Sequence, residues 1–168
     1  MVRRREEQIE GGYIMGGINE LANTLKELIE TQREILKHED KLRKIGERMK
    51  EYFTELLEDY LRKDMNMSIP VRQRILKGGD YRLIVERVDI RTERWNQKLT
   101  ISLGSDEAGY YDIDLTINLE PDNVLFIVEN LEDIIDILKE ALEKKKKELT
   151  TLKERVKKAV NKVSELAV

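Results

Sequence analysis

The chain has 168 residues, of which 39% are charged and only 5% aromatic, and its net charge is −3. This length allows one domain with a substantial core, and the high charge with few aromatics is typical of long solvated helices. Because there is no cysteine, disulfides, thiolate catalysis and cysteine-ligated metal clusters are excluded. The weakly negative charge gives no general attraction to nucleic acids or membranes.

The sequence contains no apolar run long enough for a signal peptide or a membrane-spanning helix. We therefore expect a soluble, cytoplasmic protein that does not contact membranes. The abundance of Glu, Lys, Arg and Ile without cysteine is also typical of proteins from thermophiles.

Residues 1–17 carry a basic and then acidic stretch, followed by two glycine pairs around Tyr13-Ile14-Met15. Four glycines in residues 11–17 weaken a helix, since each costs up to about 1 kcal/mol there. The sequence predicts a flexible N-terminal arm over 1–17. The glycines do not form a phosphate-binding loop, because no Gly-Lys-Ser/Thr follows them.

A first long helix is predicted over residues 18–64. One heptad position is apolar at every turn, while its partner position turns polar in the middle at Gln32, Glu39 and Gly46. A second apolar row beside the seam widens the face in the first half, as expected when a helix touches more than one neighbour. We therefore expect this half to be an oligomer or partner interface. Its residues are Leu21, Ala22, Leu25, Leu28, Ile29, Ile35 and Leu36.

An antiparallel β-meander of three to five strands is predicted over residues 65–129. The strand patterns cover 71–76, 81–90, 99–103 and 112–119, and turn residues separate them. The last of these patterns alternates strictly between apolar and polar residues, which indicates a sheet with one buried and one solvated face. Residues 124–128 fit either an edge strand or the beginning of the last helix.

A second long helix is predicted over residues 130–168, with Asn130 as N-cap and Asp133 completing a capping box. Apolar residues recur at alternating steps of four and three, and only Lys145 breaks the pattern. A seam of this length is typical of a coiled coil. We expect the two long helices to pair as one antiparallel arm, giving an α+β, helix–sheet–helix, single-domain fold. The seam comprises Leu131, Ile135, Leu138, Leu142, Leu149, Leu152, Val156, Ala159, Val163 and Leu166.

No catalytic or metal-binding set can be assembled. Asp112 and Asp114 leave the same face of a strand, but a solvated sheet face explains them as well as a hard-metal or two-carboxylate site does. His38 is the only histidine, and it has no partners for a zinc site or a catalytic triad. We predict neither enzymatic activity nor a cofactor.

Basic residues in the predicted meander offer an alternative function. Basic groups beside an aromatic ring are a common way to hold single-stranded nucleic acid. Acidic residues interleave with them and aromatics are few, so nucleic-acid binding is the second hypothesis. The candidate contacts are Arg72, Arg74, Arg91, Arg94 and Trp95.

The order of helix, β-meander and helix resembles the plan of prefoldin subunits, in layout and without a prefoldin motif. It also resembles dimeric coiled-coil proteins whose small β domain docks a partner. The first resemblance implies a holdase chaperone, which is the third hypothesis. The leading hypothesis is a non-catalytic, homo-oligomeric scaffold or adaptor that binds an unidentified protein partner, because the heptad seams are the strongest patterns in the sequence.

Overall fold

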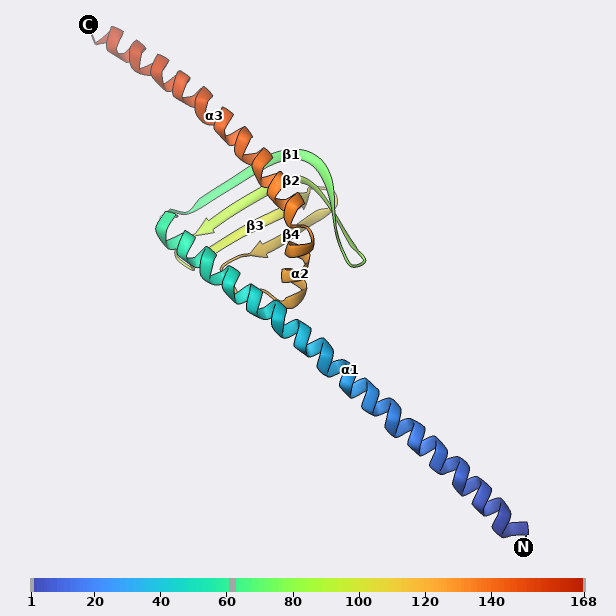
Figure 1. Ribbon diagram of the computed structural model, residues 1–168. Helices are drawn as coiled ribbons and strands as arrows, with labels where there is room; N and C mark the ends of the chain where they lie inside the picture. Colours follow the sequence, from blue (N-terminus) through green and yellow to red (C-terminus); the bar gives the residue numbers. More distant parts are fainter. Residues whose placement is uncertain (1, 61–62, 168) are drawn as a thin grey trace. The chain divides into compact units, whose positions relative to one another are not determined.

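A computed structural model describes the backbone of residues 2–60 and 63–167 and the side chains from residue 11 onward within those ranges. The fold is α+β, with two long helices flanking a four-stranded antiparallel sheet (Figure 1), which confirms the predicted fold class. The elements are α1 (Val2–Tyr60), β1 (Met65–Gly78), β2 (Tyr81–Glu93), β3 (Lys98–Ser105), β4 (Gly109–Asp114), α2 (Pro121–Glu129) and α3 (Leu131–Leu166).

The chain forms two compact units, residues 1–42 and residues 43–168, and each is described by itself. The first unit is the N-terminal part of α1. The second contains the rest of α1, the whole sheet, α2 and α3. All large side chains that are fully buried among the described residues belong to the second unit.

The sheet is a simple meander in the order β1-β2-β3-β4. Gly79 and Gly109 lie in or beside tight turns with φ of +58° and +93°, a backbone conformation that glycine adopts without a steric penalty. The predicted strands over 71–76, 81–90 and 99–103 are confirmed, and β1 begins earlier, at Met65. The predicted strand over 112–119 ends at Asp114, and Ile117 is exposed. The alternation of apolar and polar residues in the sequence therefore continues past the last residue that pairs with β3.

The pairing of β1 with β2 contains an irregularity between Pro70 and Arg74. In β1 the buried residues change from odd to even positions, from Ile69 and Val71 to Leu76; β2 makes the same change between Val85 and Val88. Both strands therefore keep their apolar residues on one face across a β-bulge.

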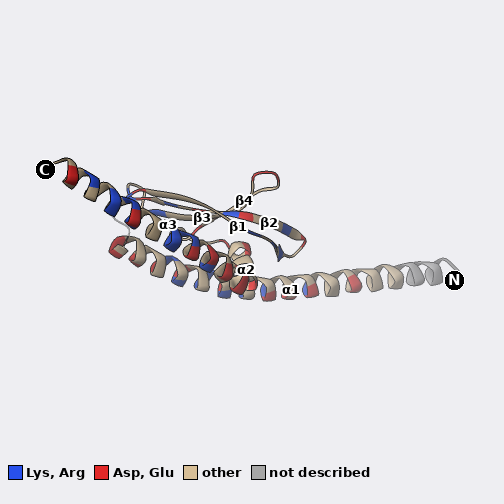
Figure 2. Ribbon diagram, turned by 90° about the horizontal axis from the view of Figure 1, so that it is seen from above, with Lys and Arg blue, Asp and Glu red and all other residues tan. Residues whose placement is uncertain are grey.

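The core lies on one face of the sheet. The helices of the second unit lie on this side, as Figure 2 shows. Cross-strand rows such as Ile69, Val88 and Leu103 point toward it. The opposite face carries polar rows, as the predicted half-solvated sheet requires. The most completely buried side chains are Leu76, Leu83, Val85, Val88, Leu103, Val124 and Ile137.

Helix boundaries differ from the prediction at two places. The backbone of α1 is helical from Val2 and through all four glycines of 11–17, where the sequence predicted a flexible arm. Glycine weakens a helix but retains its N–H group and tolerates helical dihedrals, so it does not end one as proline does. Residues 124–128 belong to α2, a helix that begins at Pro121, where the missing N–H is not needed.

Asn130 does not act as the predicted capping-box residue. It separates α2 from α3, and its side chain makes no capping hydrogen bond to α3. It instead donates from Nδ2 to the carbonyls of Lys77 (2.8 Å) and Phe126 (2.9 Å). Its Oδ1 accepts from the N–H of Lys77 at 3.2 Å. The amide thus binds the end of β1 as a neighbouring strand would.

Candidate assembly interface

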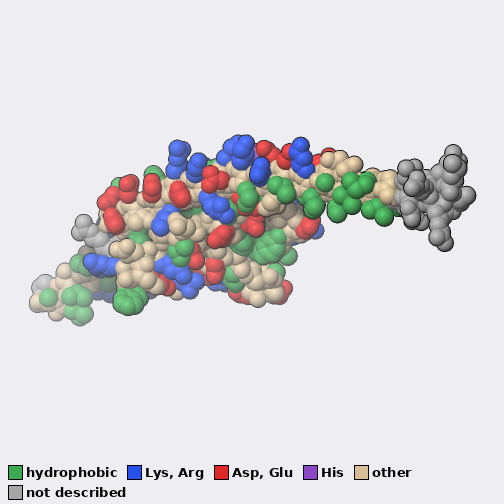
Figure 3. Space-filling view, turned by 90° about the horizontal axis from the view of Figure 1, so that it is seen from below, with side chains coloured by type: hydrophobic (Ala, Val, Ile, Leu, Met, Phe, Trp, Pro, Cys, Tyr) green, Lys and Arg blue, Asp and Glu red, His purple; other side chains and the backbone are tan. Residues whose placement is uncertain are grey.

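The N-terminal unit of α1 presents a continuous apolar face that nothing in its own unit covers. Figure 3 shows apolar side chains gathered along this part of α1, beside the residues that are not described. Leu21 is 59% exposed and Leu28 is 60% exposed. The face, called here the α1 face, comprises Ile14, Met15, Ile18, Leu21, Ala22, Leu25, Leu28, Ile29, Ile35 and Leu36.

The two heptad positions that flank the α1 seam carry no charge over residues 17–36. On one side the seam is widened by Ala22, Ile29 and Leu36, and on the other it is followed by Thr24 and Thr31. In two-stranded coiled coils these flanking positions commonly hold the charged residues that select a partner. An apolar face that extends into its flanking positions is typical of a helix that contacts more than one neighbour.

The size of the α1 face is that of a real interface. With about half of each large side chain exposed, the face presents on the order of 800 Å², which is what one partner contributes to a standard protein–protein interface. Exposed apolar patches of this size mark interaction sites on soluble proteins. Single exposed leucines would need no such explanation.

The same rows of residues continue along α1 into the second unit, where they pack in the core. Leu57 is buried, and Gly46 packs beneath Val124 and Leu119. A Cβ atom on Gly46 would lie 3.0 Å from Val124 Cγ2 and 3.2 Å from the Leu119 carbonyl oxygen. The break in the seam at Gly46 therefore allows α1 to approach α2 closely. It is a packing feature of the core.

α3 has two separate apolar faces. Ile134, Ile137 and Ala141 are buried toward the sheet. The predicted heptad seam lies beside this face. Apart from the half-buried Leu138 and Lys145, its residues are exposed, from Leu131, at 46%, to Leu166, at 87%. Its large exposed members are Leu131, Ile135, Leu142, Leu149, Leu152, Val156, Val163 and Leu166. The part of α3 after Lys145 is exposed throughout the described residues.

α3 is fixed to the β1 bulge by charged groups. Glu140 Oε2 accepts from the N–H of Arg72 at 2.8 Å and lies 3.6 Å from Nη1 of Arg74. The same Arg74 nitrogen donates to the Arg72 carbonyl at 2.9 Å, and Lys144 Nζ donates to the Pro70 carbonyl. Burial pushes the Glu140 pKa upward, but the Arg72 N–H and the charges of Arg74 and Lys144 outweigh it, so the pKa is lowered.

The structure does not bring the five candidate nucleic-acid residues together. Arg72 and Arg74 belong to the bulge that α3 covers. Arg91 pairs with Asn66 and Thr100 in a polar row on the other face. Arg94 and Trp95 lie in the β2–β3 turn, where Trp95 is 91% exposed and borders a hollow with Lys63 and Asp64. One strand of nucleic acid would meet only part of this set.

The acidic residues of β4 are hydrogen-bonded to hydroxyls of β3. Asp114 Oδ1 accepts from Thr100 Oγ1 at 2.6 Å and lies 3.8 Å from Lys98 Nζ. Asp112 accepts from Ser102. These contacts account for both carboxylates as members of a polar sheet face. Within the described residues, no group of three or more acidic or histidine side chains is placed to hold a metal ion.

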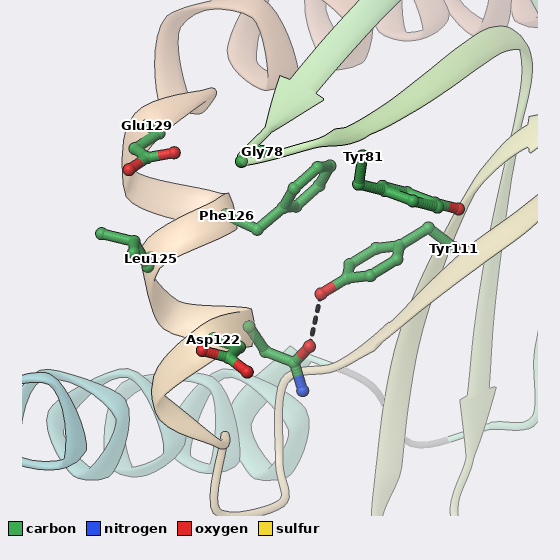
Figure 4. Close-up of a pocket in the computed structure, with 9 residues that line it drawn as sticks. Gly78, Tyr81, Tyr111, Asp122, Leu125, Phe126 and Glu129 are labelled. Atoms are coloured by element: carbon green, nitrogen blue, oxygen red, sulfur yellow. Dashed lines mark hydrogen bonds between the residues drawn. The ribbon is translucent and has the colours of Figure 1, made fainter. Parts of the chain in front are cut away.

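An aromatic cluster that the sequence did not indicate joins α2 to the sheet edge (Figure 4). The rings of Tyr111 and Phe126 are 4.5 Å apart between centroids, and Tyr81 lies 6.2 Å from Tyr111. Tyr111 donates to Asn123, and burial, Tyr81 and Asp122 raise the pKa of its hydroxyl, which keeps it a neutral donor. The cluster borders a shallow hollow of about 360 Å³.

A Cβ atom on Gly78 would lie 2.7 Å from Phe126 Cδ2. The rings therefore fill the space between β1 and α2, and we interpret the cluster as the packing of α2. Sequence periodicity does not reveal it, because Tyr81, Tyr111 and Phe126 come from three elements.

No protein-family model, curated protein or solved structure matches this chain. Among the described helices, none combines the length and the apolar character that a membrane span requires.

Proposed function

We propose that this protein is a non-catalytic scaffold that self-assembles through the α1 face. The observation that carries the proposal is a wide apolar surface on α1 that its own unit leaves exposed. Burying about 800 Å² of such surface on each copy contributes substantially to association, since apolar burial is its dominant favourable term.

The number of helices in the assembly can be inferred from the residues that flank the α1 seam. Because both flanking positions are uncharged over residues 17–36, charge repulsion between identical helices does not oppose self-association. The width of the face favours a bundle of more than two helices. The folded second unit of each copy would then be held at a common assembly point, which is what a scaffold or adaptor does.

The test is the mass of the particle in solution. Light scattering after size exclusion, at micromolar concentration, should give the wild-type chain a mass of several copies. The double variant Leu25→Glu and Leu28→Glu places two charges in the α1 face and should lower that mass, while circular dichroism shows the helices retained.

The matched control places the same two charges elsewhere on the same helix. Asn19→Glu and Asn23→Glu lie outside the α1 face and should leave the mass unchanged. A wild-type chain that is monomeric at these concentrations would overturn the proposal. An equal loss of mass in the control pair would show that charge in general, and not the α1 face, controls assembly.

A further inference from the structure

The heptad seam of α3 is a second surface, distinct from the α1 face. It runs the whole length of α3, about 54 Å at ~1.5 Å per residue. Over its first turns, Ile134 and Ile137 pack toward the sheet on a different side of the helix, and most of the seam, apart from the half-buried Leu138 and Lys145, is left exposed. An apolar seam of this length costs solubility unless a partner covers it.

Most residue types on the seam favour two parallel strands. One heptad position holds three β-branched residues, Ile135, Val156 and Val163, together with Leu142 and Leu149. The other position holds four leucines together with Lys145 and Ala159. β-branched residues at the first position with leucine at the second favour parallel dimers. In contrast to the α1 face, most flanking positions here are charged beyond the sheet, including Lys146, Lys153 and Arg155, so the apolar stripe is narrow. A narrow stripe suits a single partner helix.

The flanking charges decide the orientation. In a parallel, in-register pair, Glu148 of one helix faces Lys153 of the other, and symmetry makes this contact twice. The next such pair sets Arg155 against Val160, so like charges do not meet there. The antiparallel register that sets Leu149 against Ala159 places Lys153 against Lys153 and Arg155 against Arg155 at its centre. Like charges at these positions oppose that arrangement.

Lys145, the one charged residue within the seam, is compatible with this pairing. Its ammonium group lies 3.1 Å from Glu148 Oε2 on the same helix, so the charge sits at the flank while the aliphatic stem covers the seam. Glu148 would then be shared between Lys145 and the Lys153 of the other copy. A single polar residue in a seam also fixes register, at some cost in stability.

We propose that the α3 helices of two copies form a parallel, in-register, two-stranded coiled coil through this seam. The proposal rests on the proposed self-assembly of the chain but uses a different surface from the α1 face. It replaces the intramolecular antiparallel arm that the sequence suggested with pairing between copies.

Single cysteines test the orientation, because the chain has none of its own. Two variants, Ala159→Cys and Leu149→Cys, one carrying a mass tag, are refolded together and oxidised mildly. In the parallel pair each cysteine faces its own counterpart, within reach of a disulfide, so only like-with-like dimers form. In the antiparallel pair residue 149 faces residue 159, and mixed dimers form. Asn161→Cys, away from the seam, is the matched control and should oxidise slowly.

Like-with-like dimers that form much faster than the Asn161→Cys dimer support the proposal. Predominant mixed dimers overturn it. Oxidation that is no faster than that of the control also overturns it, because the seams of two copies would then not lie together. Repeating the experiment in chains that also carry Leu25→Glu and Leu28→Glu distinguishes pairing through α3 from assembly through the α1 face. Rapid like-with-like dimers there show that α3 pairs even if the α1 face does not assemble.

Discussion

At the scale of single residues, Asn130 connects two helices to the sheet. It is 6% exposed and ends α2, and its side-chain amide hydrogen-bonds to both the N–H and the carbonyl of Lys77. Asparagine is suited to this task because its amide carries a donor and an acceptor side by side, which can bind the N–H and the carbonyl of one residue together. One side chain thus fixes the break between two helices to the end of a strand.

We expect Asn130→Ala to lower the free energy of unfolding by about 1–2 kcal/mol, because it removes three hydrogen bonds of a buried amide, two of them to the part-buried N–H and carbonyl of Lys77. The measurement is denaturant unfolding at a fixed protein concentration. Asn161→Ala, an exposed asparagine on α3, is the control and should change stability by less than about 0.5 kcal/mol. Equal effects of both substitutions would refute this role for the buried amide.

At the scale of elements, α1 and α3 share a heptad pattern, but only α1 packs part of that pattern in the core. Part of the α1 pattern packs in the core around Gly46 and Leu57, and the remainder forms the α1 face. α3 packs on the sheet with residues outside its heptad seam and is fixed to β1 by Glu140 and Lys144. The contact between α3 and β1 is therefore partly ionic and should depend on pH.

Because the pKa of Glu140 is lowered in the folded state, the ionised form stabilises the fold above the unfolded pKa. That contribution is lost as the pH falls through the lower, folded pKa. We expect Glu140→Gln to reduce stability by about 1 kcal/mol at pH 7. The difference from wild type should shrink once the pH falls below the ordinary carboxyl pKa of 4.5.

Unfolding curves of wild type and variant between neutral and acid pH measure this difference. Glu143→Gln is the matched control, since Glu143 makes only an exposed pair with Lys146, at 3.8 Å on the same helix. Such pairs contribute less than about 0.5 kcal/mol. A Glu140→Gln effect that is independent of pH would show that the charge of Glu140 does not stabilise the bulge.

At the scale of the whole molecule, the folded core and the α1 face belong to different parts of the chain. The sheet, α2, α3 and residues 43–60 of α1 form one compact unit that contains every fully buried large side chain described. The N-terminal unit, residues 1–42, contributes exposed apolar surface. A domain with its own core folds independently of such an extension.

We therefore expect a fragment of residues 43–168 to fold cooperatively and to have a midpoint of thermal unfolding within a few degrees of the full chain's. It should lack the higher-order assembly that we assign to the α1 face, and any remaining species should be the α3 dimer. Thermal unfolding by circular dichroism and light scattering measure the two properties. An unfolded fragment would show that assembly through residues 1–42 is required for folding.

The sequence by itself determined the types of the long elements and the apolar faces that they carry. Periodicity reports which face of a helix or strand is apolar, so the antiparallel sheet, the α1 face and the α3 seam were all visible in it. Periodicity does not report what covers each face. It therefore did not reveal that Ile134 and Ile137, beside the α3 seam, are the residues that pack on the sheet.

Only the tertiary structure decided the features that depend on contacts between distant segments. The partners of Asn130 and Glu140 lie 53 and 68 residues away, and the aromatic cluster draws on three elements. The structure also accounts for Gly46 as a site of close packing and for Arg74 as a contact of the bulge. Local pattern fixes propensity and amphipathicity, whereas packing selects which apolar faces become core and which remain exposed.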